Sequence, residues 1–268
     1  MAQLLKYFGI TAIFFAIFAV NAQADTWQDL KGDHFVVYYN FKEDLPNVQL
    51  LLRKAEEYYD RIARQIGYAR YANFWTWDER VKIIVFPNQE TFVRNTHQPA
   101  WSRGYAERDS ELFHSRIIVT YRQEADFLEG LLPHEIGHLI LHDFVGFSTF
   151  LPLWFDEGVA QLQEKDKKGL ADQFIKPLAK QRSHVPFKLL MYWDIRKESD
   201  AQKVKIFYAQ SVSIVDFMIK NYGSSAFGNF CRNLKEGKTM EEVLRSTYTG
   251  TIDSVENLEK RWVEYMSH

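Results

Sequence analysis

The sequence predicts an α+β protein in which a strand-containing N-terminal lobe precedes a helical C-terminal lobe. Two patterns support this prediction. Short alternating or β-branched apolar segments recur up to about residue 124 and stop there. Beyond that point apolar residues recur at helical spacing, and several segments open with helix-capping residues. We expect the N-terminal lobe to span about 25–145 and the helical lobe about 146–268, with one helix between them.

Three segments of the N-terminal lobe are predicted to be strands. Residues 33–39 alternate in the way that favours a strand, and 81–86 form a continuous β-branched run closed by Pro87, which indicates a buried strand. A third strand is expected within 103–120, around Ile117-Ile118-Val119. Apolar residues at helical spacing predict two helices in this lobe, 46–66 and the shorter 89–95.

The rest of the chain predicts helices alone. Residues 124–144 read as one helix, which Pro133 either kinks or restarts. Further helices are predicted over 153–164 and 205–221. Two more helices are predicted to begin at sequences that resemble capping boxes, Thr239-x-x-Glu242 and Asp253-x-x-Glu256.

The composition is that of a globular protein with a sizeable core. Of the 268 residues, 46% are hydrophobic and 25% are charged, which is ordinary for a folded chain. The formal net charge of -2 gives no basic excess, so nucleic acid is not an expected partner. Cys231 is the only cysteine, so no disulfide can form within the chain. We expect Cys231 to be buried on an apolar helix and the protein to be a monomer.

The N-terminus has the order of a cleavable secretory signal. A short start with Lys6 precedes an uncharged apolar run over 7–20, and Ala22-Gln23-Ala24 provides a small-x-small cleavage site. The run is shorter than the ~20 residues of a membrane-spanning helix. We therefore expect residues 1–24 to be a signal peptide and the protein to be exported, periplasmic or secreted. The alternative is an uncleaved anchor that keeps the protein at a membrane.

The residues His134-Glu135-Ile136-Gly137-His138 form an H-E-x-x-H motif. On a helix, residues four apart share a face, with Cβ atoms about 5–6 Å apart, so the two imidazoles can converge on one Zn²⁺. Glu135 projects toward the same ion without taking a ligand position. Gly137 is unfavourable in mid-helix by ~1 kcal/mol, so we expect local packing to require it.

A catalytic zinc needs a third protein ligand. An H-E-x-x-H-x-x-G-x-x-H arrangement is absent, because Leu141 and Phe144 occupy the positions of its Gly and third His, so His142 and Glu157 are the candidates. His142 continues the four-residue spacing, but it lies ~12 Å along the helix axis from His134. It is expected to be a helix-end histidine favoured by the helix dipole. Glu157 follows His138 after 18 residues, enough for one helix to end and a second to run back alongside it. Glu157 is the preferred ligand; a first-turn acid favoured by the dipole is the alternative.

The motif, its spacing and the sequence Trp154-Phe155-Asp156-Glu157-Gly158-Val159-Ala160 resemble the gluzincin metallopeptidases. The chain as a whole resembles the bacterial peptidase MA-like proteins, also through Tyr208-Ala209-Gln210 and a last helix containing Trp262. This resemblance implies a zincin-like fold with a cleft between the lobes. It implies His134, His138 and Glu157 as zinc ligands and Glu135 as general base.

The resemblance implies further roles near the metal. Tyr208 is expected to donate to the developing oxyanion, although a tyrosine opening an apolar helix is also often a core residue. Asp156 is expected to hydrogen-bond a ligand histidine. A G-x-M-E-N run, which anchors a free substrate N-terminus in aminopeptidases, does not precede the motif. An endopeptidase is therefore expected rather than an exopeptidase.

Together these features predict a zinc-dependent metallopeptidase that cleaves peptide or protein substrates with water activated by zinc and Glu135 as general base. By analogy with zincins, the edge of the strand at 116–120 is expected to pair with an extended substrate. A zinc hydrolase acting on another bond would need the same residues, so that alternative stays open. Two further alternatives stay open. One is a zinc-containing binding module with little turnover, although such a module has no need of Glu135; the other is a structural protein in which the motif is accidental.

Overall fold

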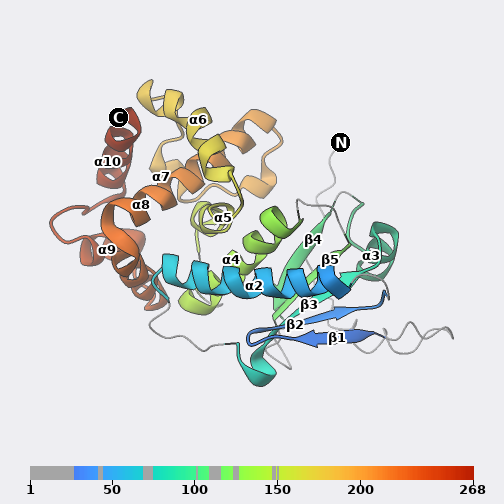
Figure 1. Cartoon of the computed structure of the whole chain (residues 1–268). Helices are drawn as coiled ribbons and strands as arrows, with labels where there is room; N and C mark the ends of the chain where they lie inside the picture. The colour runs from blue at the N-terminus through green and yellow to red at the C-terminus, as the bar shows by residue number, and fades with distance from the viewer. Residues whose placement is uncertain are drawn as a thin grey trace.

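The computed structural model describes residues 27–41, 45–68, 75–100, 102–108, 116–122, 127–146, 149 and 151–268. The predicted α+β class is confirmed: one sheet lies beside a group of helices, and every element described after residue 121 is a helix (Figure 1). The predicted signal segment falls outside the described residues. Within the described ranges, no helix is both long and apolar enough to cross a membrane.

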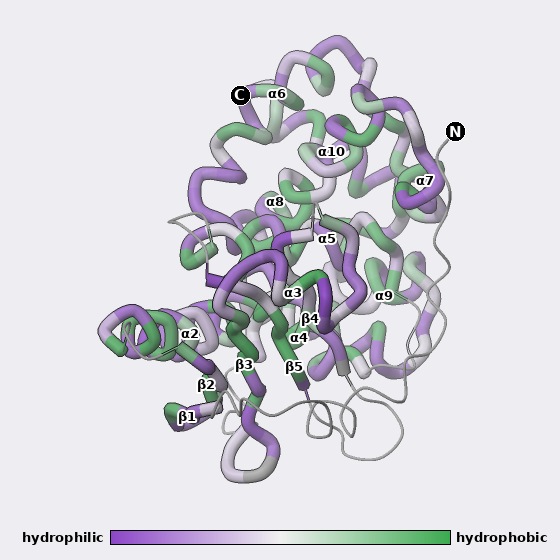
Figure 2. Tube along the Cα trace, turned by 90° about the vertical axis from the view of Figure 1, so that its right-hand side faces the viewer, coloured by the Kyte–Doolittle hydropathy of each residue, from purple (hydrophilic) through white to green (hydrophobic). Residues whose placement is uncertain are grey.

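The sheet has five described strands in the order β1-β2-β3-β5-β4. The three inner strands run parallel, and β1 and β4 pair antiparallel at the two edges. In Figure 2 the hydrophobic β3 and β5 lie in the middle of the sheet. The bounds are β1 Gln28–Lys31, β2 Phe35–Tyr39, β3 Val81–Phe86, β4 Gly104–Arg108 and β5 Arg116–Tyr121.

The three predicted strands are confirmed as β2, β3 and β5, and both edge strands were missed. Val37, Ile83 and Ile118 align across the inner strands and are fully buried. The edge strands have the sequences QDLK and GYAER, which are short and carry no apolar alternation. Their extended conformation comes from pairing with a neighbour, which a periodicity analysis cannot detect.

Helices cover both faces of the sheet. On one face Val37, Ile83 and Ile118 join the main hydrophobic core together with α2, which lies across the sheet in Figure 1. On the other face Phe92 packs in a smaller cluster with Phe86. The helices near the sheet are α2 Leu45–Gln65, η2 Trp77–Glu79, α3 Gln89–Thr96, a π-helical turn η3 Phe127–Leu131 and α4 Leu132–Val145. The predicted helices at 46–66 and 89–95 are thus confirmed.

The remaining helices pack around α8, the longest helix. The predicted helix over 153–164 is α5, whereas α6 was missed because Gly169 and Pro177 interrupt its pattern. The predicted helix at 205–221 is part of α8, whose two segments join at Gly223 with φ 81°. The bounds are α5 Leu153–Gln161, α6 Lys167–Lys180, α7 Phe187–Leu190, η4 Ile195–Lys197, α8 Ala201–Lys235, α9 Met240–Thr247 and α10 Val255–Ser267.

One of the two predicted capping boxes is wrong. Thr239 and Glu242 form a reciprocal capping box at the start of α9, as predicted. At α10 the cap is Ser254, whose hydroxyl accepts from the Asn257 backbone N–H at 3.2 Å. The sequence predicts the neighbouring residue, Asp253, as the cap. Adjacent Asp and Ser are both good N-caps, so sequence alone does not choose between them.

Helix α4, which carries the H-E-x-x-H motif, starts afresh after the π-helical turn. Pro133 lies in its first turn, where a missing N–H costs nothing, so it restarts the helix rather than kinking it. The far end is fixed by a buried ion pair: Arg116 of β5 binds Asp143 with Nε–Oδ2 at 2.6 Å and Nη2–Oδ1 at 3.0 Å. Trp75 also donates to Asp143. A two-point pair between guanidinium and carboxylate holds the helix end against the sheet.

Two glycines allow the helices around the motif to approach closely. A Cβ on Gly137 of α4 would lie 3.1 Å from Cα of Ala160 in α5. A Cβ on Gly158 of α5 would lie 2.6 Å from the Ser211 carbonyl oxygen of α8. The packing reason expected for Gly137 is therefore confirmed. Helix α5 is held at a close distance between α4 and α8.

We predict that Gly158→Ala destabilises the protein. The added methyl collides with backbone, which cannot turn aside, so the free energy of unfolding should fall by about 1–3 kcal/mol. Gly169→Ala in α6 is the matched control, because its Cβ would meet nothing within 4 Å. Thermal unfolding of both variants measures the difference. Equal unfolding temperatures for the two would contradict the close approach of α5 and α8.

Candidate functional site

Helices α4 and α5 lie side by side and bring three polar side chains together. His138 Nε2 lies 3.1 Å from His134 Nε2, and His134 Nε2 lies 3.9 Å from Glu157 Oε2. One donor atom from each of the three residues lies within 4.8 Å of the others. The 18-residue gap thus does what the sequence predicted: α4 ends, the chain turns, and α5 returns beside it.

The donor set fits a zinc ion. Both Nδ1 atoms contact carboxylates, so a ring that binds a metal through Nε2 would keep its proton on Nδ1 and direct the Nε2 lone pair at the ion. Two acceptors 3.1 Å apart repel each other unless a cation or proton lies between them. Two nitrogens bound to one tetrahedral zinc at about 2.0–2.1 Å would be about 3.3–3.4 Å apart. The observed spacing is close to that value.

The sequence interpretation missed the residue that contacts His134. Glu164, just beyond α5, lies with Oε1 2.9 Å from His134 Nδ1, and its other oxygen accepts from Lys167 at 3.2 Å. Burial raises the pKa of Glu164, but the hydrogen bonds and charges of His134 and Lys167 together outweigh burial, and the net shift is downward. The sequence did contain a signal for Glu164. It follows Glu157 by seven residues, about two helical turns, which would place both acids on the same face of a helix.

The structure places Asp156 where the resemblance suggested. Its Oδ1 lies 2.7 Å from His138 Nδ1. Burial raises the pKa of Asp156, but His138 and His142 outweigh that effect and the net shift is strongly downward, so the group is a carboxylate. Burial alone lowers the pKa of His138, but Asp156, Glu157 and Glu135 raise it to about 10.

His142 does not behave as a simple helix-end histidine. Its Nε2 lies 3.1 Å from Asp156 Oδ2, the oxygen that His138 does not use. It belongs to a second group with His138 and Asp156, and this group shares His138 with the group of His134, His138 and Glu157. The expectation for His142 was therefore incomplete. Its spacing along α4 predicted which face it shares, but not the carboxylate it contacts from α5.

Glu135 and Tyr208 both lie close to this cluster. Burial is the largest influence on the pKa of His138 and of Glu157, and the nearby charge of Glu135 adds a smaller upward effect on both, so Glu135 lies close to these two groups. Tyr208 of α8 is half-buried, and burial together with the charge of Glu157 raises its pKa to about 12. Tyr208 therefore keeps its proton at neutral pH and can donate a hydrogen bond.

The prediction about the substrate-binding edge of the sheet is wrong in its choice of strand. Strand β5 pairs with β3 on one side and with β4 on the other, so neither of its edges is available. The outer strand is β4, and a Cβ on its first residue, Gly104, would lie 2.8 Å from Leu131, directly before α4. Since GYAER has no strand pattern, sequence analysis could not identify β4 as the edge.

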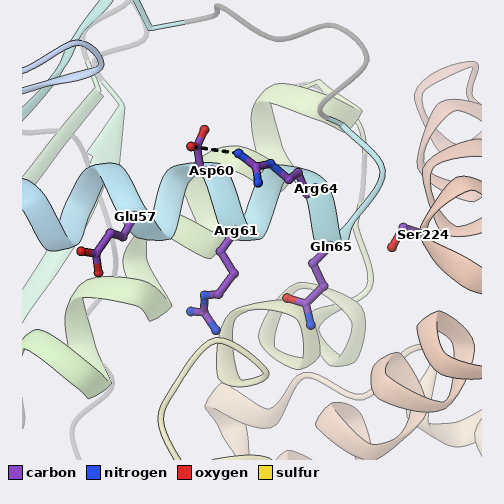
Figure 3. A pocket seen from close by; sticks show the side chains of 6 residues that line it. All are labelled: Glu57, Asp60, Arg61, Arg64, Gln65 and Ser224. Atoms are coloured by element: carbon purple, nitrogen blue, oxygen red, sulfur yellow. Dashed lines mark hydrogen bonds and ion pairs between the residues drawn. The ribbon is translucent and has the colours of Figure 1, made fainter.

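The described part of the molecule also has a concave region whose lining contains none of the histidines of the cluster. A cavity of about 620 Å³ between α2 and α8 is lined by Glu57, Asp60, Arg61, Arg64, Gln65 and Ser224 (Figure 3). Its charges already have partners: Asp60 pairs with Arg64 at 3.1 Å, and Arg61 donates to the Gln163 carbonyl. Surface pairs of this kind contribute little free energy. The donor geometry at α4 and α5, rather than this cavity, identifies the candidate site.

The fold and the cluster define a class of protein. It is an α+β protein in which two adjacent helices bring two histidines and a glutamate into an arrangement that could hold a metal ion. The model of the Peptidase MA superfamily matches residues 63–268, a range that includes α4, α5 and α8, and the chain belongs to this superfamily. Membership suggests a metallopeptidase-like function, for which zinc is the general cofactor and peptides or proteins are the substrates. Comparison with curated proteins found no match.

Proposed function

We propose that the protein is an exported zinc metallopeptidase of the gluzincin type, with a zincin-like fold, that hydrolyses internal peptide bonds. One observation carries the proposal. His134 Nε2 and His138 Nε2 face each other at 3.1 Å beside the Glu157 carboxylate, while both outer nitrogens contact carboxylates. This arrangement leaves three donors directed at one point and fixes the ring orientations.

Each residue has a defined role in the proposed reaction. When bound, zinc supplies a Lewis acid that polarises the scissile carbonyl and lowers the pKa of water toward about 7. His134, His138 and Glu157 hold the ion, and Glu135 takes a proton from the attacking water and delivers it to the leaving amine. Tyr208, which is protonated at neutral pH, donates to the oxygen on which negative charge develops.

Strand β4 is the proposed site for the substrate backbone. It is the outer strand on the side of the sheet next to α4, since Gly104 lies against Leu131. An extended peptide can add to such an edge through main-chain hydrogen bonds. Binding by backbone contacts does not require a free substrate terminus, which favours internal cleavage.

Digestion of a peptide library by the purified mature protein tests the proposal. Internal cleavage is expected with zinc present, loss of cleavage with a chelator, and recovery when zinc is restored. A panel of ester substrates run in parallel separates a peptidase from another zinc hydrolase. Zinc-loaded protein that cleaves esters and leaves every peptide intact would contradict the peptidase assignment.

Export is expected to remove residues 1–24 and to leave Asp25 as the new N-terminus. The apolar run over 7–20 and the Ala22-Gln23-Ala24 sequence motivate this prediction. N-terminal sequencing of the exported protein measures it. A membrane-bound product that still begins at Met1 would instead support an anchor, and would restrict the substrates to those near a membrane surface.

A further inference from the structure

Asp156 is held from two sides by histidines of the same helix. Its Oδ1 contacts His138 Nδ1 at 2.7 Å, and its Oδ2 contacts His142 Nε2 at 3.1 Å. His134, His138 and His142 follow one another at four-residue intervals along one face of α4. Asp156 and Glu157 are adjacent in α5. Glu157 lies near the Nε2 atoms of His134 and His138, whereas Asp156 contacts the rings of His138 and His142.

The protons in this chain of contacts follow from the ligand role of His138. If Nε2 of His138 binds the ion, Nδ1 must carry the proton and donate it to Asp156 Oδ1. Oδ2 of Asp156 then accepts from His142, whose proton must lie on Nε2. Both oxygens of Asp156 are thus engaged by histidines, which holds the carboxylate against rotation away from His138.

We propose that His142 is a positioning residue for the metal centre: by holding Asp156, it fixes the ring of His138 toward the ion. This inference rests on the proposed zinc site. The support of the other ligand is built differently, since Glu164 behind His134 is held by Lys167, a partly exposed lysine. His142 is the less exposed of the two supports, and it comes from the same helix as the ligand it steadies.

The test measures the zinc dissociation constant by competition with a chelator. In His142→Leu, which removes the donor, affinity should fall about tenfold, the lower end of the range for such partners. His142→Gln keeps a donor near the same position and should remain within about twofold of the wild type. His184→Leu is the matched control, because His184 forms a similar pair with Glu259, at 2.9 Å, outside the site. It should leave zinc affinity unchanged even if it lowers the unfolding temperature.

A double-mutant cycle shows whether His142 acts through Asp156. Asp156→Ala should weaken zinc binding by about 10–100-fold. Adding His142→Leu to that variant should cause no further loss, because the residue it acts through is gone. The visible spectrum of the cobalt-substituted protein, which reports coordination geometry, should change in His142→Leu and not in His184→Leu.

Several outcomes would overturn the inference. Unchanged zinc affinity in His142→Leu, or the same loss with and without Asp156, would remove the positioning role. Two zinc ions per wild-type chain and one in His142→Leu would make His142 a ligand of a second ion instead. Wild-type protein that binds no zinc would overturn the proposed function as well. A zinc-binding, peptide-cleaving wild type with an unaffected His142→Leu variant would overturn this inference alone.

Discussion

Peptide hydrolysis is expected to be lost in Glu135→Gln, while the fold and the zinc content are kept. Glutamine matches the size of the side chain but cannot accept a proton, so the general base disappears. General acid–base catalysis is typically worth about 10²–10⁴-fold in rate, and the loss should be at least in that range. Glu135 does not belong to the three-residue donor group, so zinc binding should survive. Rate measurements on zinc-loaded variant and wild type give the comparison.

Glu129→Gln is the matched control for this experiment. Glu129 precedes the same helix, is partly exposed, and pairs with Lys165. The change removes one carboxylate near the site without touching the histidines, so hydrolysis should continue at close to the wild-type rate. If Glu135→Gln also retained the wild-type rate, another group would have to be the base and the proposed mechanism would be wrong.

The second large effect is expected in Glu157→Ala, which should lose most of its zinc. The variant removes one of three protein ligands and leaves two imidazoles facing each other. Zinc affinity should fall by more than the ~10–100-fold typical of a hydrogen-bond partner behind a ligand. Chelator competition measures the dissociation constant, and circular dichroism shows whether the helices remain.

Glu256→Ala serves as the control for Glu157→Ala. Glu256 is an exposed acid in the first turn of α10, paired with Lys188, and it lies in neither donor group. Its removal changes the net charge equally and should leave zinc affinity unchanged. Full zinc occupancy in Glu157→Ala under chelator would show that Glu157 is only a first-turn acid of α5.

The parts of the fold that the sequence predicted correctly are those with a local pattern. The buried run of β3 and the apolar spacing of α2 are set by nearby residues. Cys231 is buried as expected, and burial raises the pKa of its thiol. Strands β1 and β4 and helix α6 were missed for the opposite reason. Their conformation depends on neighbours distant in sequence, or their pattern is interrupted by Gly and Pro.

The candidate site was likewise predictable only in those parts that follow from local sequence spacing. The spacing of His134 and His138, and the return of the chain to Glu157, follow from helix geometry and from the length of the connection. The carboxylate contacts behind the histidines do not. Helix α5 ends at Gln161, so Glu164, which contacts His134, lies beyond the helix, where helical spacing no longer predicts its position. The contact of His142 with Asp156 depends on how two helices pack. The ion pair of Arg116 with Asp143 likewise joins residues 27 apart in sequence.

The central claim is that His134, His138 and Glu157 hold one zinc ion, and zinc quantification on the purified mature protein tests it most directly. Elemental analysis after dialysis without chelator should find one Zn²⁺ per chain, and His134→Ala and His138→Ala should each lose most of it. Folded wild-type protein with a zinc content near zero, in a preparation never exposed to chelator, would contradict the account.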